Sequence, residues 1–335
     1  MTEIVIRQPG IAEIEDAPPP EPSEGDCVIR VVRSTVSQTD VHVFNGAYRE
    51  QHYPRVPGAH AVGFIERCPG RLSPLRRVVV PGVIPCGGCT ACAAGRREQC
   101  LTPLLRGRHR DGGMREVMTV PAEEPITISE SLDPDGAVCV PEVAFALSIV
   151  SRAEATGRSP FLVVFGAGFL GIVTALTARE KGLTVILADV VQARLELARS
   201  LGVEHVCNPL RDFIGDQVRW ITRTRLAETA IVTSEDAEAV LTATSVLRPG
   251  GLLLLTGLHT DSQLPVRGVI DNSLRVAGVR RTRERYGEAA AFIRRNREAF
   301  QLLISLRLEP ESMPQTFALL AQEPKSYMKA ICAFD

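Results

Sequence analysis

The chain has 335 residues, of which 45% are hydrophobic and 23% are charged, and its formal net charge is −1. This length allows two domains of ordinary size, and the composition is that of a globular protein with a substantial core. Because the charge is close to zero, nothing favours a nucleic acid or a membrane surface as partner. No apolar run approaches the roughly 18 residues of a membrane-spanning helix. The first ten residues lack the pattern of a signal peptide, so we expect a cytoplasmic protein.

The first 140 residues predict a β-rich domain with little helix. Short segments rich in β-branched residues are separated by proline, glycine and charged turns. These segments are 3–7, 26–34, 61–66, 77–82 and 116–121. The pattern indicates a partly antiparallel β domain.

From about Glu142 the pattern changes to strands that alternate with helices. The expected strands are 161–165, 184–189, 230–234 and 252–257, and the expected helices include 192–202 and 235–247. Such alternation implies βαβ units and a doubly wound parallel sheet. After about Arg281 the chain becomes helical, and its last nine residues hold a possible final strand. The predicted fold class is therefore an α/β domain joined to a β-rich domain.

The stretch FLVVFGAGFLG combines a buried strand with glycines in the G-x-G-x-x-G spacing of a dinucleotide-binding turn. Gly166 permits the tight turn, and Gly168 lets the backbone approach a pyrophosphate. Gly171 lets the following helix pack closely against the strand. The amide groups at the start of that helix, where Phe169 and Leu170 lie, can donate hydrogen bonds to phosphate.

Asp189 ends the next expected strand, 18 residues beyond Gly171. Its carboxylate can accept hydrogen bonds from both ribose hydroxyls of NAD, and it would repel the 2′-phosphate of NADP. Arg194 follows five residues later and offers some affinity for phosphate, so NADP(H) is the less favoured alternative to NAD(H). The structural alternative is a glycine-rich turn whose aspartate caps a loop.

Four of the nine cysteines form a cluster with the spacing C-x2-C-x2-C-x7-C. They are Cys86, Cys89, Cys92 and Cys100. Four thiolates this close in the chain can surround one Zn²⁺ with no open coordination position, which is typical of a structural site. An iron–sulfur cluster and two disulfides are the alternatives. The other five cysteines, at positions 27, 68, 139, 207 and 332, are expected to be small buried residues.

Together these features resemble the medium-chain dehydrogenase/reductase superfamily, in its zinc alcohol dehydrogenase-like branch. The segment VPGAHAVG lies where the family has G-H-E-x-x-G, and DGGMREVMTVP resembles the stretch after the family's cysteine lobe. The resemblance covers nearly the whole chain. It implies a GroES-like catalytic domain (1–142 and 282–335) with a structural zinc lobe (86–100), a Rossmann domain (143–281), and a homodimer.

The family's catalytic zinc is held by a cysteine in C-x-[ST]-D, by the histidine of G-H-E, and by a later cysteine, aspartate or glutamate. The aligned positions in this chain are Ser37, Ala59 and Val140, with Cys139 and Glu142 close to the third. A serine hydroxyl is a poor zinc ligand and an alanine methyl group is none. The resemblance therefore predicts that the catalytic zinc is lost.

Thr39 and His42 align with the residues that carry a proton between substrate and solvent in the family. Hydride transfer still requires such a relay without zinc, and histidine titrates near neutrality. Ser37 is a further active-site candidate. His60 is another, as an acid, as an orienting group, or as part of a rearranged zinc site. The structural alternative is a capping box between Ser37 and Asp40 that opens a short helix with His42 on its surface.

These residues predict an NAD(H)-dependent oxidoreductase that transfers a hydride to or from a small organic substrate without a catalytic zinc. The substrate would be an alcohol or ketone, or an activated C=C or C=N acceptor. The competing hypotheses are a zinc alcohol dehydrogenase with rearranged ligands and a non-catalytic NAD-binding protein. Phe44, Tyr48 and Tyr53 are candidates for lining the substrate pocket, with loop packing as the alternative.

Overall fold

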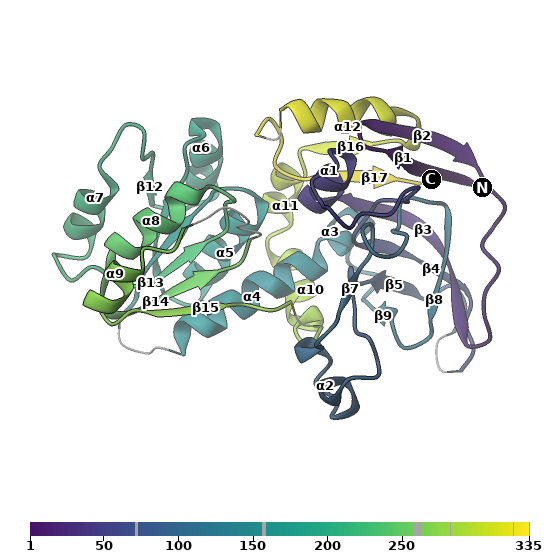
Figure 1. The fold of residues 1–335 in the computed structure, drawn as a ribbon, viewed down its shortest axis with the longest axis horizontal. Helices are drawn as coiled ribbons and strands as arrows, with labels where there is room; N and C mark the ends of the chain where they lie inside the picture. Colours follow the sequence, from purple (N-terminus) through teal and green to yellow (C-terminus); the bar gives the residue numbers. More distant parts are fainter. Residues whose placement is uncertain (71–72, 156–158, 258–262, 282, 324, 335) are drawn as a thin grey trace. The chain divides into compact units, whose positions relative to one another are not determined.

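The chain divides into two compact units in the computed structural model. The first unit comprises Met1–Pro141 and Tyr286–Asp335, and the second comprises Glu142–Arg285. The described residues are 1–70, 73–155, 159–257, 263–281, 283–323 and 325–334. Figure 1 shows that each unit has its own sheet. Within the described residues, every helix is too short or too polar to span a lipid bilayer.

The first unit is built on a seven-stranded sheet. Its strands are β3 (Asp26–Val36), β4 (Ala61–Arg67), β5 (Arg77–Val80), β8 (Val117–Pro121), β9 (Ile126–Thr127), β16 (Leu306–Leu308) and β17 (Ala330–Ala333). Their order is β16-β17-β3-β4-β5-β9, and β8 pairs with β3 beside this path. Only β16 and β17 pair in parallel among these strands. The long strand β3 therefore joins the N-terminal and C-terminal parts of the unit.

Two hairpins and several short helices complete the first unit. The hairpin strands are β1 (Thr2–Gln8) with β2 (Ile11–Asp16), and β6 (Val83–Ile84) with β7 (Leu104–Leu105). The helices are α1 (Gln38–Phe44), α2 (Thr90–Ala93), α3 (Pro134–Val138), α10 (Tyr286–Arg295), α11 (Arg297–Leu303) and α12 (Met313–Gln322), with 3₁₀ turns η1 (Arg97–Gln99) and η2 (Pro310–Ser312). The helices α1 and α12 pack together through Phe44, which stacks on Phe317 at 5.6 Å between ring centroids.

The second unit is a parallel six-stranded sheet with helices between its strands. The strands are β10 (Phe161–Phe165), β11 (Thr184–Ala188), β12 (His205–Cys207), β13 (Ala227–Val232), β14 (Leu247–Leu255) and β15 (Arg275–Gly278). The helices are α4 (Val140–Glu154), which begins at the boundary of the units, α5 (Phe169–Glu180), α6 (Gln192–Ser200), α7 (Ile214–Ile221), α8 (Ala237–Ser245) and α9 (Val266–Asp271). This is the doubly wound arrangement that the alternation of strands and helices predicts.

The strand order of this sheet, β12-β11-β10-β13-β14-β15, changes direction at β10. The chain runs outward from β10 through β11 to β12 and then returns to the other side of β10 with β13. Ligands of such sheets bind outside the carboxyl ends of the strands at this switch point. Residues that follow β10, β11 and β13 are therefore placed at the ligand-binding edge.

The predicted fold class, an α/β unit with a Rossmann sheet beside a GroES-like β-rich unit, is confirmed. The sequence reading did not find the short strands β12 and β15 or the helix α7. The strand β12 has three residues, and β15 (Arg275–Gly278) is mostly exposed at the edge of the sheet, so neither has a clear hydrophobic pattern. The helix α7 has a clear apolar stripe, formed by Ile214, Val218 and Ile221, which the sequence analysis did not use.

The expectation of separate buried thiols is wrong for Cys27 and Cys68, which form a disulfide. Val28 of β3 pairs with Arg67 of β4, so the antiparallel register places the two cysteines opposite each other. The pair is separated by 41 residues in the sequence, and sequence spacing gave no sign of it. The cysteines at 139, 207 and 332 are free and buried, as expected.

Candidate functional site

The turn between β10 and α5 has the geometry that its glycines predict. Gly166 has a φ of +102°, in the region that side chains rarely adopt. A Cβ atom on Gly171 would overlap the carbonyl oxygen of Gly166. Gly168 has open space where a Cβ would lie, and no side chain caps the helix that it begins. The turn thus leaves backbone N–H groups of an uncapped helix next to empty space, which suits a phosphate ligand.

Asp189 lies directly after β11, beside this turn. Its Oδ2 accepts a hydrogen bond from the amide of Ala167 at 2.6 Å, and its Oδ1 accepts one from the amide of Val191 at 2.7 Å. Each carboxylate oxygen can accept a second hydrogen bond, so the half-buried side chain keeps capacity for ribose hydroxyls. Arg194 lies in the first turn of α6, where its amide donates to the carbonyl of Val191.

Phe169 and Leu170 differ in their surroundings. Phe169 is buried in the core of the second unit, whereas Leu170 is half-buried. Phe169 therefore contributes packing and its backbone, and Leu170 is the more accessible of the two. With the space at Gly168 and the carboxylate of Asp189, these residues fit a dinucleotide.

The four clustered cysteines of the first unit come together in a loop around α2. Their sulfur atoms all lie within 4.8 Å of one another, and the sulfurs of a tetrahedral Zn²⁺ site are about 3.8 Å apart for bonds of about 2.3 Å. The amide of Cys86 donates to the sulfur of Cys100 at 3.1 Å, and the amide of Cys92 donates to that of Cys89 at 3.5 Å. All four are free of disulfides. The donor set fits one zinc ion.

Hydrogen bonds in this loop favour the thiolate form that a metal requires. A hydrogen bond from Thr102, with others from Cys100 and the backbone, lowers the pKa of Cys86 to about 6. A hydrogen bond from the backbone of Leu101 lowers the pKa of Cys89. Thiolates are the zinc ligands among cysteine side chains, so Cys86 and Cys89 are suited to bind zinc at neutral pH. Burial raises the pKa of Cys92 to about 12, so this thiol would lose its proton only when the metal binds.

The helix α1 begins with the capping box that we weighed as the structural alternative. Ser37 is its N-cap residue; Asp40 Oδ2 accepts hydrogen bonds from the amide and the hydroxyl of Ser37, at 2.7 and 2.6 Å. Asp40 Oδ1 accepts from the amide of Gly58 at 2.7 Å. The pKa of Asp40 is raised, because the effect of burial exceeds the opposing effects of these hydrogen bonds and of the charge of Lys329. Asp40 therefore joins α1 to the loop that contains Gly58.

Thr39 and His42 lie on this helix, three residues apart and hence on one face. Both side chains are half-buried. The Nδ1 atom of His42 lies 3.4 Å from the hydroxyl of Tyr48, and the two rings meet edge to face at 5.9 Å. The sequence-predicted relay residues are thus close together, and Tyr48 adds a third polar group beside them.

The other two aromatic candidates serve packing. Phe44 belongs to the core of the first unit. The hydroxyl of Tyr53 donates to the carbonyl oxygen of Val43 at 2.5 Å, which fixes the loop after α1. Of the three aromatic residues, Tyr48 is the one placed beside His42.

His60 is held inside the first unit. Only 4% of it is exposed, and its Nδ1 accepts a hydrogen bond from the amide of Gly82 at 2.8 Å. Its own amide donates to Thr35 Oγ1, and its carbonyl oxygen accepts from the amide of Thr35. An Nδ1 that accepts from a backbone amide belongs to a neutral imidazole with its proton on Nε2. His60 is thus bound to the backbone through Nδ1, and its proton lies on Nε2.

Comparisons with known proteins extend over both units. The family profile described as "Alcohol dehydrogenase GroES-like domain" matches residues 23–130, and the one described as "Zinc-binding dehydrogenase" matches residues 170–295. The chain belongs to the medium-chain dehydrogenase/reductase superfamily. It is accordingly an oxidoreductase by family.

Individual relatives of this superfamily align with most of the chain. An uncharacterised zinc-type alcohol dehydrogenase-like protein of Haemophilus influenzae is 28% identical over 99% of this chain and 98% of its own length. An alcohol dehydrogenase of Geobacillus stearothermophilus is 28% identical over 84% and 85%. The structure of RspB from Escherichia coli, a complex with NADH, covers 100% of this chain and 99% of its own with a TM-score of 0.88 and 23% identity. That last likeness shows the fold.

The superfamily's positions for catalytic zinc can now be located in this chain. Ser37 caps α1, and Ala59 precedes the buried His60. Cys139 is buried, and its sulfur lies 3.6 Å from the carbonyl oxygen of Asp135. Across the described part of the chain, the cysteine lobe is the one group of three or more histidine, cysteine or acidic side chains close enough to share a metal. The loss of the catalytic zinc remains a prediction.

Sequence reasoning did not find two partners of the candidate residues. It did not indicate that Gly58 donates to Asp40, or that Arg108 lies over the ring of Tyr48 with its guanidinium carbon 3.7 Å from the ring centroid. Tyr48 and Arg108 are far apart in sequence and share no motif. The one local signal for Arg108 was the polar run RGRHRD at residues 106–111, which leads into DGGMREVMTVP.

Proposed function

We propose that the protein is an NAD(H)-dependent dehydrogenase or reductase that acts on a small organic substrate without a catalytic zinc. The observation that carries this proposal is the turn after β10, with its open position at Gly168 and with Asp189 beside it. The NADH complex of the similarly folded RspB is consistent with it. NAD(H), when bound, would accept or supply the hydride.

The choice of NAD(H) over NADP(H) rests on Asp189. Its carboxylate stands where the adenosine ribose of a Rossmann dinucleotide is held, and its charge would repel a 2′-phosphate. Arg194 lies one helical turn further on, and its side chain is half-buried rather than extended into solvent. This favours NAD(H).

Thr39 and His42 are the residues that we assign to proton transfer. Thr39 would form a hydrogen bond with the substrate oxygen. His42, one turn later on the same face of α1, would exchange the proton with solvent. Without a Lewis acid, hydrogen-bond donors must polarise the substrate. This suits an alcohol–ketone pair or an acceptor that is already activated, such as a conjugated C=C or a C=N.

The remaining parts of the proposal follow the superfamily. One structural zinc would be held by the four lobe cysteines, where it fixes the loop 86–100 and takes no part in the reaction. A homodimer is the expected assembly.

The cofactor assignment is tested with Asp189→Ala. We expect wild-type protein to bind NADH more tightly than NADPH, because Asp189 accepts from the ribose hydroxyls and repels the additional phosphate. The variant should lose about tenfold in NADH affinity, which corresponds to about 1.4 kcal/mol for lost charged hydrogen bonds. Its NADPH affinity should rise or stay the same. Titration of nicotinamide fluorescence measures all four affinities, and tighter NADPH binding by wild type would contradict the assignment.

The relay is tested with Thr39→Val and His42→Gln. The kinetics use the best substrate from a panel of alcohols, ketones and activated alkenes. Each variant should lower kcat by about 10²-fold or more, the usual contribution of a proton-transfer group. The unfolding temperature should stay close to that of wild type, because both side chains are half-buried and outside the core. Stopped-flow and steady-state kinetics provide the measurement. NADH binding without turnover on any substrate would instead favour a non-catalytic NAD-binding protein.

His60→Leu distinguishes a structural histidine from a catalytic one. The variant leaves the amide of Gly82 without its acceptor in the interior, which should cost about 1–3 kcal/mol of unfolding free energy. Denaturant unfolding measures this loss. If His60 is structural, kcat of the folded variant and its pH profile follow wild type; a changed pH profile at unchanged stability would instead make His60 an active-site acid.

A further inference from the structure

Arg108 lies in a loop of the first unit that the backbone holds firmly. The amide groups of Arg108, His109 and Arg110 all donate to the carbonyl oxygen of Leu105, at 3.3, 2.8 and 3.2 Å. The carbonyl oxygen of Arg108 accepts a hydrogen bond from Gln51 Nε2 at 3.2 Å. The base of the arginine side chain is therefore fixed relative to the segment that follows α1.

The guanidinium group of Arg108 is stacked on an aromatic ring. Its central carbon lies 3.7 Å from the centroid of Tyr48, the distance of a close cation–π contact. Stacking holds the planar group in one orientation, which is the arrangement in which arginine binds carboxylate or phosphate through two parallel hydrogen bonds. Tyr48 thus prepares Arg108 for an anion.

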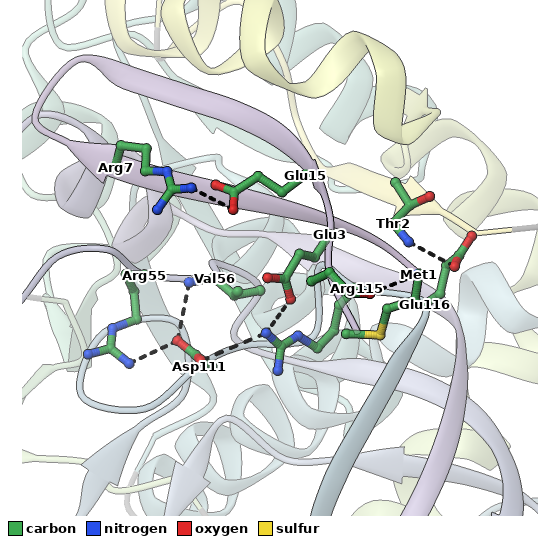
Figure 2. A network of polar contacts seen from close by, with 11 residues as sticks. Met1, Thr2, Glu3, Arg7, Glu15, Arg55, Val56, Asp111, Arg115 and Glu116 are labelled. Carbon is green, nitrogen blue, oxygen red and sulfur yellow. Dashed lines mark hydrogen bonds and ion pairs between the residues drawn. The ribbon is translucent and has the colours of Figure 1, made fainter. Parts of the chain in front are cut away.

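Among the described residues, three arginines near Arg108 have carboxylate partners that Arg108 lacks. The neighbouring ion pairs are Arg106 with Glu124, Arg55 with Asp111, and Arg115 with Glu3 and Asp111. Figure 2 shows Asp111 between Arg55 and Arg115, and the carboxylate of Glu3 at the same nitrogen of Arg115 that faces Asp111. Within the described residues, Arg108 forms no ion pair with a carboxylate, and its buried Nε atom has no hydrogen-bond partner.

A neighbouring imidazole experiences this charge. Burial lowers the pKa of His109, and the positive charges of Arg108 and Arg55 lower it further. The guanidinium that lies on Tyr48 is thus one of two positive charges acting on His109, and the other, Arg55, is paired with Asp111.

The same tyrosine connects Arg108 to the proposed relay. The Tyr48 hydroxyl lies 3.4 Å from His42 Nδ1, while its ring face carries the guanidinium. An anion on Arg108 would therefore lie about one aromatic ring from the group that we assign to proton transfer. That separation suits two functional groups of one small molecule.

We propose that the substrate carries an anionic oxygen group, a carboxylate or a phosphate, and that Arg108 binds it. This proposal rests on the proposed dehydrogenase function. It narrows the substrate class from alcohols and ketones in general to hydroxy or oxo acids and phosphorylated alcohols. Arg108 would determine specificity, while Thr39 and His42 act on the reacting oxygen.

The first experiment measures anion binding without turnover. Inorganic phosphate and acetate are titrated separately into the zinc-loaded protein by calorimetry, with and without NADH. We compare wild type with Arg108→Gln and with Arg110→Gln, an exposed arginine of the same loop. We expect wild type and Arg110→Gln to bind one of the anions, and Arg108→Gln to bind it about 10- to 100-fold more weakly, the usual loss for charged hydrogen bonds. The anion that binds distinguishes carboxylate from phosphate.

The second experiment measures kcat/KM for matched pairs, such as 3-hydroxybutyrate with its methyl ester and glycerol 3-phosphate with glycerol. Wild type should prefer the anionic member of one pair by about 10- to 100-fold. Arg108→Gln should abolish this preference, lowering kcat/KM for the anionic member about 10- to 100-fold more than for the neutral member. Arg108→Lys should restore part of the preference.

Two outcomes would overturn the proposal. One is equal anion binding by wild type and Arg108→Gln. The other is binding of phosphate that disappears when NADH is present, because phosphate would then occupy the dinucleotide site instead of the substrate site. Because the calorimetric result needs no turnover, it stands even if the protein transfers no hydride. A failure of the dehydrogenase proposal would appear separately, as absent NADH binding or absent turnover.

Discussion

Gly171→Ala should destabilise the dinucleotide-binding unit strongly, whereas Gly168→Ala should leave its stability unchanged and weaken NADH binding. A methyl group on Gly171 would overlap the carbonyl oxygen of Gly166, which is backbone and cannot rotate away. Overpacking of this kind costs about 3 kcal/mol or more. We expect a fall of roughly 5–10 °C in the unfolding temperature for such a loss.

Gly168 provides the matched variant, three residues earlier in the same turn. Nothing lies within 4 Å of a Cβ atom built there, and its φ of −71° suits alanine. The added methyl group would occupy the space that we assign to the pyrophosphate, so NADH affinity should fall by about tenfold or more. Calorimetric unfolding and NADH titration of both variants test the pair. Unchanged NADH affinity in Gly168→Ala would place the dinucleotide elsewhere.

Cys92→Ser should remove the zinc and destabilise the lobe formed by residues 86–100. We expect elemental mass spectrometry to find about one zinc per chain in wild type, because one tetrahedral site is formed by the four cysteines. A metal that is bound only by the folded loop contributes its binding free energy to the stability of that loop. Cys92→Ser should therefore lose at least several kcal/mol of this stability. Limited proteolysis should then cleave within the lobe, since its short elements α2 and η1 have little core of their own.

Cys139→Ser is the control for the zinc measurement. This cysteine is also buried, but it lies outside the lobe and near the superfamily's third catalytic-zinc position. The zinc content should stay at about one per chain. About two zinc ions in wild type, with one lost in Cys139→Ser, would contradict the metal-free site and favour a zinc alcohol dehydrogenase with a rearranged ligand set.

Sequence reasoning worked best where the chemistry lies within one short segment. The strand, turn and helix around Gly166 are consecutive, and both Gly166 and Gly171 have backbone roles that no other residue can take. The lobe cysteines span fifteen positions, so their spacing alone brings them within reach of one ion. The capping box of Ser37 and Asp40 is likewise a contact between residues three apart, and the sequence reading had named it as an alternative.

Contacts between segments far apart in the sequence determined the surroundings of His60 and the pairing of two cysteines. His60 follows Ala59, the residue aligned with the superfamily's zinc-binding histidine, and the sequence suggested an active-site acid. In the structure, the amide of Gly82, from another segment, fixes its Nδ1. Cys27 and Cys68 looked like isolated thiols until the pairing of β3 and β4 placed them opposite each other. A one-residue change of strand register reverses the face of every side chain, and residue spacing does not reveal that register.

The sequence by itself determined the superfamily, the glycine-rich turn after β10, the cluster of four cysteines and the helix that carries Thr39 and His42, because each depends on local spacing and backbone geometry. The tertiary structure alone decided which charges remain available. In the part of the chain that the structure describes, Arg55, Arg106 and Arg115 pair with carboxylates, whereas Arg108 is stacked on Tyr48 without one. Pairing of charges depends on distances between separate loops, and these exist only once the sheet has brought the loops together.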